Sequence, residues 1–173
     1  AIVELARLGA STVIRIGGMG SFADDLLPGS IGVVTSTTPQ SSAASFYLRG
    51  GATSDVTLSR LLLRGAKQTG RFCRPIRVAS IDGYYVGQGR PVPGFETAAE
   101  AQLDSIRRSG VDGVDMEAQT VIGVGSALGL RSAAVLGVHG SRITDSWYEE
   151  YEALQHDVVA TALFAAAGLS EAG

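Results

Sequence analysis

Residues 113–118, Gly-Val-Asp-Met-Glu-Ala, join a short apolar run to a long segment without charge. That segment, residues 118–128, reads AQTVIGVGSAL, and a helix with this composition is expected to be buried on several faces. The junction therefore predicts a short buried strand that leads directly into a buried helix. Carboxylates beside such a helix cost free energy unless they are paired or hydrogen-bonded, so Asp115 and Glu117 need partners.

Two interpretations of this acidic pair are open from these six residues. In the structural one, Asp115 caps the helix and Glu117 interacts with the positive end of its dipole, together worth about 1 to 2 kcal/mol. In the functional one, Glu117 accepts two hydrogen bonds from a ligand diol, such as the 2′ and 3′ hydroxyls of a ribose. The six residues alone favour the structural interpretation.

Strands and helices are expected to alternate outward from this junction. The β-branched and apolar runs that predict strands are residues 11–16, 31–35, 76–81, 111–116 and 132–138. The patterns that predict helices are residues 55–69, 97–109, 118–128 and 147–167, the last with Gly168 as its cap, while residues 36–53 read as a loop. Such alternation indicates an α/β fold with a mixed, largely parallel sheet flanked by helices. At 173 residues, the chain 1–173 is expected to form a single domain.

Composition excludes several classes of function. The chain has 14 Lys and Arg against 17 Asp and Glu, a net charge of -3, and no basic cluster, so nucleic-acid binding through surface charge is not expected. Its apolar runs are too short for a membrane span. Cys73 is the only cysteine, which rules out an intrachain disulfide and a cysteine-rich metal site. Residues 1–10 read as the tail of a helix already under way, so we expect the domain to be truncated at its N-terminus.

A glycine-rich segment follows the strand predicted at residues 11–16. Residues 17–20 read Gly-Gly-Met-Gly, which predicts a loop whose backbone N–H groups form an anion-binding nest. Arg15 lies just before it and supplies a permanent cation, a combination that suits phosphate. An ordinary surface arginine is the alternative, and it is less expected within a β-branched run.

Three patches together resemble the nucleoside phosphorylase superfamily, and specifically its uridine phosphorylase branch. Residues 13–20 resemble the branch's strand and phosphate loop, and residues 84–90, Tyr-Tyr-Val-Gly-Gln-Gly-Arg, resemble its uracil-recognition segment. Residues 115–117, Asp-Met-Glu, resemble its ribose-binding motif. The order and spacing agree along almost the whole chain. The resemblance implies the family's fold and a phosphate-dependent cleavage of uridine or a related pyrimidine nucleoside, with no metal or organic cofactor.

The resemblance also implies a role for each site residue, and the chemistry of the side chains agrees. Gln88 can donate to and accept from the uracil edge, and Arg90 adds a fixed fork of donors that stabilises charge on the departing base. Glu117 would hold the ribose hydroxyls while the sugar carbon reacts. The remaining implied substrate contacts are Arg15, Gly17, Gly18 and Gly20 at the phosphate, Asp115 and Met116 at the ribose, and Tyr84 and Arg142 at the base. Without the resemblance, Gln88 and Arg90 could equally belong to a solvated loop.

The chain also departs from the family's pattern. Gly18 stands where these phosphorylases usually have a threonine that contacts phosphate and ribose, and Asp115 replaces a longer glutamate. His139 and Gly140 stand where the pocket is usually apolar. These departures leave two hypotheses open: a uridine phosphorylase-like enzyme, or a catalytically inactive phosphorylase-fold subunit of a larger assembly. By resemblance the enzyme would be a homo-oligomer, a dimer or hexamer, most simply in the cytoplasm, with an organelle as the alternative.

Overall fold

Strands and helices alternate along the chain, as the sequence predicts. The computed structural model describes residues 1–40 and 43–170. In chain order the elements are α1 (Ile2–Arg7), β1 (Thr12–Ser21), β2 (Ile31–Thr38), the 3₁₀ turn η1 (Ala44–Phe46), α2 (Val56–Gln68), β3 (Cys73–Ser80), the 3₁₀ turn η2 (Val86–Gln88), α3 (Glu96–Arg108), β4 (Gly113–Asp115), α4 (Ala118–Ala127), β5 (Arg131–Ser141), β6 (Ser146–Trp147) and α5 (Tyr151–Ser170). None of the described helices is both long and apolar enough to cross a bilayer.

The strands form one mixed sheet that closes on itself. Their order is β1-β4-β3-β2-β5-β6, and β1 also pairs with β5, so β1, β4, β3, β2 and β5 form a ring. The pairs β1–β5, β2–β3 and β3–β4 are parallel, whereas β1–β4, β2–β5 and β5–β6 are antiparallel. The predicted α/β class with a mixed sheet is therefore confirmed. Closure of the sheet depends on long-range pairing, which periodicity within one strand does not report.

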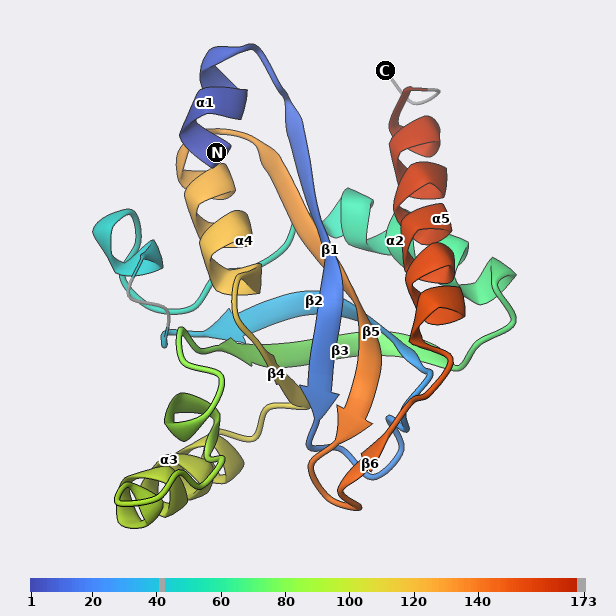
Figure 1. Cartoon of the computed structure of the whole chain (residues 1–173). Coiled ribbons are helices and arrows are strands. Elements are labelled where there is room, and N and C mark those ends of the chain that lie inside the picture. The colour runs from blue at the N-terminus through green and yellow to red at the C-terminus, as the bar shows by residue number, and fades with distance from the viewer. Residues whose placement is uncertain (41–42, 171–173) are drawn as a thin grey trace.

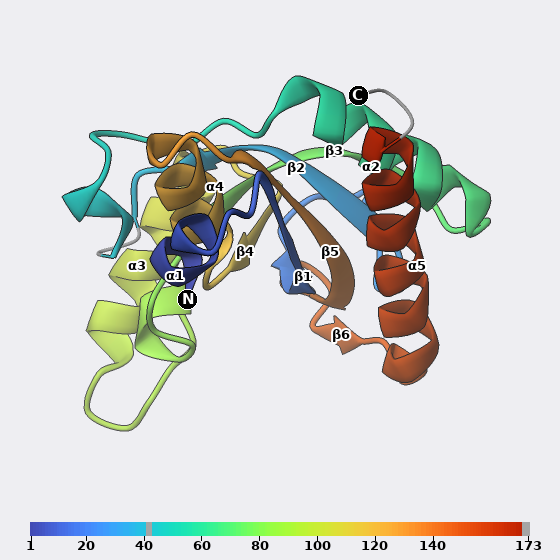
Figure 2. The same cartoon turned by 90° about the horizontal axis from the view of Figure 1, so that it is seen from above.

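Helices cover the strands on two sides. In Figures 1 and 2, α1 and α4 lie on one side of the strands and α2 and α5 on the other. One core cluster packs α4 against β1, β2, β3 and β5 and includes Ile122, Val34 and Leu136. Another packs α2 and α5 against β2 and β5. The strand ends between these layers are left to carry the loops that shape the site.

The local signals of α2 explain why this segment is helical where the sequence predicts it. Asp55 precedes the helix, and its carboxylate accepts a hydrogen bond from the Leu58 amide at 2.8 Å. The apolar side chains Leu58 and Leu62 are fully buried on the face that meets the sheet. Beyond the last turn, Gly70 has a φ of +76°, a conformation that favours glycine and ends the helix.

The glycine-rich segment is strand rather than loop, which corrects the sequence-based expectation. β1 continues through Gly17, Gly18 and Gly20 because the ladder with β5 extends to Ser21, with one register shift at residues 19 and 20. A Cβ on Gly17 would lie 2.6 Å from the Arg15 guanidinium, so the glycine leaves room for that side chain. Extended backbone does not bring successive N–H groups together in the concave arrangement that a nest requires, so the predicted anion nest is not formed.

The ends of the chain's last elements also differ from the prediction. Trp147 does not begin the closing helix, because it pairs with Gly140 in the β5–β6 hairpin, and α5 starts at Tyr151. Gly168 lies inside α5 and does not cap it. A Cβ there would be 3.0 Å from the Leu61 side chain of α2, so the glycine permits close helix packing.

The loop predicted at residues 36–53 is shorter than expected. β2 extends to Thr38 because residues 36–38 pair with β3, and η1 lies within the remainder. Residues 41–42 of that prediction lie outside the described part of the chain.

Candidate active site

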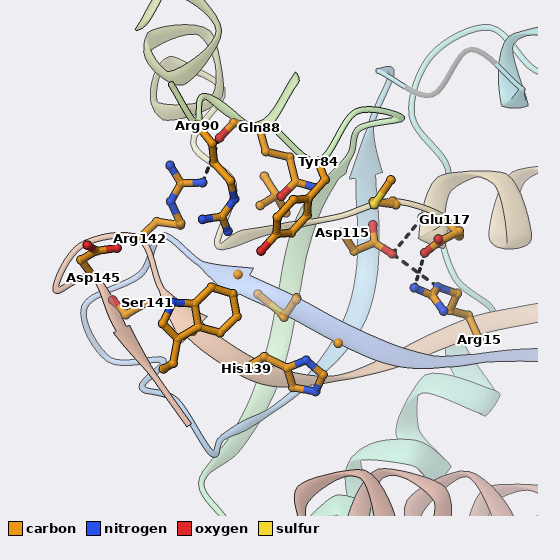
Figure 3. A pocket seen from close by; sticks show the side chains of 17 residues that line it. Arg15, Tyr84, Gln88, Arg90, Asp115, Glu117, His139, Ser141, Arg142 and Asp145 are labelled. Atoms are coloured by element: carbon orange, nitrogen blue, oxygen red, sulfur yellow. Dashed lines mark hydrogen bonds and ion pairs between the residues drawn. The ribbon is translucent and has the colours of Figure 1, made fainter. Parts of the chain in front are cut away.

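A cavity of about 280 Å³ lies where β1, β5, the η2 segment and the β4–α4 junction meet. Figure 3 shows side chains from these separate segments turned toward it. The predicted site residues that line it are Arg15, Gly18, Gly20, Tyr84, Gln88, Arg90, Asp115, Met116, Glu117 and Arg142. Gly17 was predicted as well and is not among the lining residues. The fold thus brings residues up to about 130 positions apart in sequence to one concave surface.

The buried Asp115 makes several hydrogen bonds on the side of the cavity that also carries Glu117. Its side chain has no exposed surface, and one oxygen accepts a hydrogen bond from Ser80 Oγ at 2.6 Å. The other accepts from the amides of Ala118 at 2.8 Å and Glu117 at 3.2 Å, at the start of α4. Arg15 Nε lies 3.5 Å from the same oxygen. Asp115 therefore fixes the β4–α4 junction, and this geometry fits the capping interpretation of its role.

Arg15 is held by its own strand and by carboxylates. Its guanidinium forms an ion pair with Glu117 and donates to the Ile16 carbonyl at 3.0 Å. With Asp115 also close, the positive charge of Arg15 is balanced within the protein. A phosphate at this place would have to compete with Glu117 for the guanidinium. Glu117 itself is 52% exposed, so its carboxylate is the member of the pair that can turn toward a ligand.

Gln88 and Arg90 lie at the opposite side of the cavity. Gln88 is 3% exposed, and its backbone carbonyl accepts a hydrogen bond from Arg142 at 2.9 Å. The Arg90 guanidinium carbon lies 4.5 Å from the ring centroid of Tyr84 and 5.6 Å from that of Trp147. Stacking between two aromatic rings restrains the guanidinium plane and leaves its edge to donate hydrogen bonds. These contacts restrain the Gln88 backbone and the Arg90 guanidinium, both of which line the cavity.

The two arginines make this side of the cavity electropositive. Burial lowers the pKa of Arg142, and the nearby charge of Arg90 lowers that pKa further. A guanidinium group keeps its positive charge in proteins, so both side chains are cations. The cavity therefore has a cationic side near Arg90 and a charge-balanced side near Glu117. This arrangement can stabilise negative charge that develops on the part of a ligand that lies near Arg90.

His139 and Gly140, which the sequence places at the pocket without a substrate contact, line the cavity, as does Met19 of the glycine-rich patch. The structure adds four lining residues that were not predicted: Val114, Ser141, Asp145 and Trp147. Trp147 reaches the cavity because the β5–β6 hairpin turns it back over Gly140. The only local signal for this turn is the pair Thr144-Asp145, residue types common in turns, and Asp145 has a φ of +50°. Among the described residues, no group of three or more His, Cys, Asp or Glu could hold a metal ion.

His139 projects from β5 toward Gly18 of the neighbouring strand. A Cβ on Gly18 would lie 2.9 Å from Nε2 of His139 and closer still to two other imidazole atoms. The ring thus occupies the space that a side chain at residue 18 would need. Burial lowers the pKa of His139 below its ordinary value of 6.5, so the imidazole is neutral at pH 7.

The lowered pKa of His139 predicts a pH dependence of stability. As pH falls through about 6.5, the unfolded chain takes up this proton before the folded chain does, so folding stability is lost until the folded-state pKa is passed. We expect the melting temperature of the wild type to fall more steeply between about pH 7.5 and 5.5 than that of His139→Asn. His156→Asn, at an exposed position on α5, should keep the wild-type slope. Parallel curves for wild type and His139→Asn would contradict the assignment.

Comparison with known proteins identifies relatives of this chain. Residues 1–170 match the family model described as the phosphorylase superfamily. The uridine phosphorylase of Thermococcus kodakarensis is 30% identical over 151 residues, which cover 85% of this chain and 54% of that protein. The Escherichia coli uridine phosphorylase is 29% identical over 147 residues, covering 80% and 56%. The DeoD-type purine nucleoside phosphorylase of Dichelobacter nodosus is 26% identical over 171 residues, covering 96% and 68%.

A solved structure agrees at the level of the fold. Purine nucleoside phosphorylase from Toxoplasma gondii, in complex with immucillin-H, superposes with a TM-score of 0.81 at 22% identity. The match covers 99% of this chain and 69% of that one. The chain spans about half the length of the uridine phosphorylases that it matches.

Proposed function

Because the chain belongs to the phosphorylase superfamily, we propose that it is a nucleoside phosphorylase that acts on uridine or a related pyrimidine nucleoside. In this reaction an oxygen of inorganic phosphate bonds to C1′ as the bond from C1′ to the base nitrogen breaks. The base leaves with the electron pair and is then protonated, giving ribose 1-phosphate and free base. The observation that supports the proposal best is the convergence of Gln88, Arg90 and Glu117 on one cavity.

The base would bind at the cationic side of the cavity. A pyrimidine such as uracil presents an acceptor, a donor and an acceptor along one edge, which suits the amide of Gln88 and the donor fork of Arg90. Negative charge that develops on the departing base would be stabilised by Arg90, whose orientation is restrained by Tyr84 and Trp147. Arg142 would act indirectly, by positioning Gln88 through its hydrogen bond to the Gln88 backbone carbonyl.

The ribose would lie between the base and Glu117. A carboxylate can accept hydrogen bonds from both the 2′ and 3′ hydroxyls, which would hold C1′ in line for attack. Met116 lines the same surface and offers an apolar contact to the sugar. Glu117 is half-exposed and pairs with Arg15 through Oε2. Its other oxygen, Oε1, can therefore turn toward a ribose hydroxyl while the ion pair is kept.

The proposed site has fewer groups available to bind phosphate than to bind the base or the ribose. The predicted nest at residues 17–20 is absent, and Arg15 is charge-balanced by Asp115 and Glu117. These features favour the second candidate function, a catalytically inactive subunit with the phosphorylase fold within a larger assembly. That candidate predicts a stable complex with other proteins on purification and no change in melting temperature with uridine or uracil.

One experiment separates the two candidates. The purified protein is incubated with uridine, with and without inorganic phosphate, and uracil and ribose 1-phosphate are quantified. Release of uracil that requires phosphate, with ribose 1-phosphate formed in equal amount, is the expected result. Inosine serves as the comparison substrate, and preferential release of hypoxanthine would reject the pyrimidine assignment. If neither base is released and neither ligand raises the melting temperature, the inactive subunit is the better description.

A further inference from the structure

The imidazole of His139 lines the cavity and lies against Gly18 of the neighbouring strand. β5 carries His139 and β1 carries Gly18, and the two strands are neighbours in the parallel part of the ladder. Because a Cβ at residue 18 would overlap Cε1 and Nδ1, the ring can lie against β1 only where residue 18 is glycine. Both residues line the cavity, and Figure 3 shows His139 apart from the cluster formed by Arg15 and Glu117.

The surroundings of the ring determine which nitrogen carries the proton. Nε2 is buried and has no hydrogen-bond partner within the part of the chain that the structure describes, whereas Nδ1 is not enclosed in this way. A proton on Nε2 would leave a buried N–H donor unsatisfied, and such orphaned donors are rare in folded proteins. Burial also keeps the ring neutral. The favoured tautomer therefore has its N–H at Nδ1, on the less enclosed edge of the ring.

His139 is the side chain nearest to Gly18 in this part of the cavity. The guanidinium of Arg15 donates to the Ile16 carbonyl and pairs with Glu117, apart from His139 in Figure 3. Ser141, two residues further along β5, accepts from the amides of residues 143 and 144 through its hydroxyl oxygen, and its O–H is a second side-chain donor on this strand. The three atoms nearest to a Cβ position at Gly18 all belong to the imidazole, so a ligand oxygen beside Gly18 lies within reach of the His139 N–H. Such an oxygen is present both on ribose and on phosphate.

We propose that His139 contacts the substrate, donating a hydrogen bond from Nδ1 to an oxygen of the sugar or of the attacking phosphate beside Gly18. The inference rests on the proposed function and adds a residue and a direction of hydrogen bonding to it. The imidazole then supplies, from β5, a donor at the place where Gly18 leaves β1 without a side chain. The bond reaches the sugar–phosphate part of the reaction and not the base, which binds beside Arg90.

A near-isosteric pair of substitutions tests the hydrogen bond. His139→Asn can place its amide N–H close to the position of Nδ1, whereas His139→Leu has almost the same size and no donor. With wild-type activity established, kcat and KM are measured for uridine and for phosphate, and uracil affinity is measured separately. We expect His139→Leu to lower kcat/KM by about 10- to 100-fold, the range of a hydrogen bond to a charged or reacting group. His139→Asn should regain most of this loss.

The separate KM values show whether the oxygen belongs to phosphate or to the sugar. Together with the wild-type activity, they also show whether this inference or the proposed function has failed. A loss in the phosphate KM identifies phosphate, and a loss in the uridine KM identifies the sugar; uracil affinity stays at the wild-type value in both cases. Equal losses in the Leu and Asn variants, or no loss in either, would overturn the inference while the wild-type activity still supports the proposed function. No uracil release by the wild type overturns both. His156→Leu, exposed on α5, is the matched control and should retain wild-type kinetics.

A second test uses the steric match between the two residues. Gly18→Ala places a methyl group against the imidazole, so it should displace the ring and reproduce the loss seen in His139→Leu. In a His139→Ala background the same methyl group meets no ring, and Gly18→Ala should then cause no further loss. Such non-additivity is expected of residues in direct contact. Additive losses in the double variant would show that Gly18 acts independently of His139.

Discussion

Glu117→Gln is expected to lower kcat/KM for the phosphorolysis of uridine by about 100-fold or more. Glutamine keeps the size of the side chain but carries no charge and has one acceptor oxygen in place of two. In the proposed site this neutral amide would hold the two ribose hydroxyls less strongly than the carboxylate does, and the sugar carbon would lose its alignment with phosphate. The loss should appear in kcat and in the KM for uridine, measured by uracil release at saturating phosphate. Glu100→Gln, at an exposed position on α3, is the control.

The kinetic parameters of this variant separate two possible roles of Glu117. Because Glu117 forms an ion pair with Arg15, its removal frees the guanidinium, and the KM for phosphate should not rise. A rise in that KM alone, with the KM for uridine unchanged, would mean that Glu117 acts by positioning Arg15. Activity equal to that of the wild type would remove Glu117 as the ribose anchor.

Asp115→Ala is expected to reduce the free energy of unfolding by about 3 kcal/mol. The substitution leaves the Ser80 hydroxyl and the two amides at the start of α4 without their acceptor, and it removes a charge from beside Arg15. All of these groups lie at the buried β4–α4 junction, where water does not readily replace the carboxylate. Urea denaturation followed by circular dichroism measures the change.

Two further variants test the cause of this loss. Asp104→Ala removes a carboxylate from the exposed face of α3 and should change the free energy of unfolding by less than about 0.5 kcal/mol. Asp115→Asn keeps the shape and one acceptor, so it should be intermediate. If Asp115→Ala is as stable as Asp104→Ala, the hydrogen bonds at the junction do not contribute as proposed.

Local patterns were sufficient for much of the fold. The amphipathic spacing of α2, the N-cap Asp55 and the terminating Gly70 are neighbours in sequence, so propensity and periodicity predict them. The β4–α4 junction was predicted for the same reason. The segment of residues 17–20 was misassigned because glycines that favour loops in isolation are placed in a strand by β5 and by the bulky side chains of Arg15 and His139.

The candidate site divides in the same way. Gln88 and Arg90 lie two residues apart on one segment, and Asp115 and Glu117 lie two apart on another. Each pair is therefore visible as a local pattern, although its role in the site came from the family resemblance and not from residue types alone. That Arg15 pairs with Glu117, 102 residues away, depends on how β1 packs beside the β4–α4 junction. Trp147 was assigned to a helix because the hairpin that places it over the cavity is closed by pairing with Gly140.

The amino-acid sequence by itself determined the order and type of most elements, the mixed α/β class and the chemical identity of the groups available to a ligand. These properties follow from the spacing of apolar residues and from side-chain chemistry, both of which are local. Only the tertiary structure decided which residues come together. It closes the ring of strands, pairs Arg15 with Glu117 and packs the His139 ring against Gly18. The physical reason is that strand pairing and side-chain volume act between residues distant in sequence, where a single sequence carries no periodic signal.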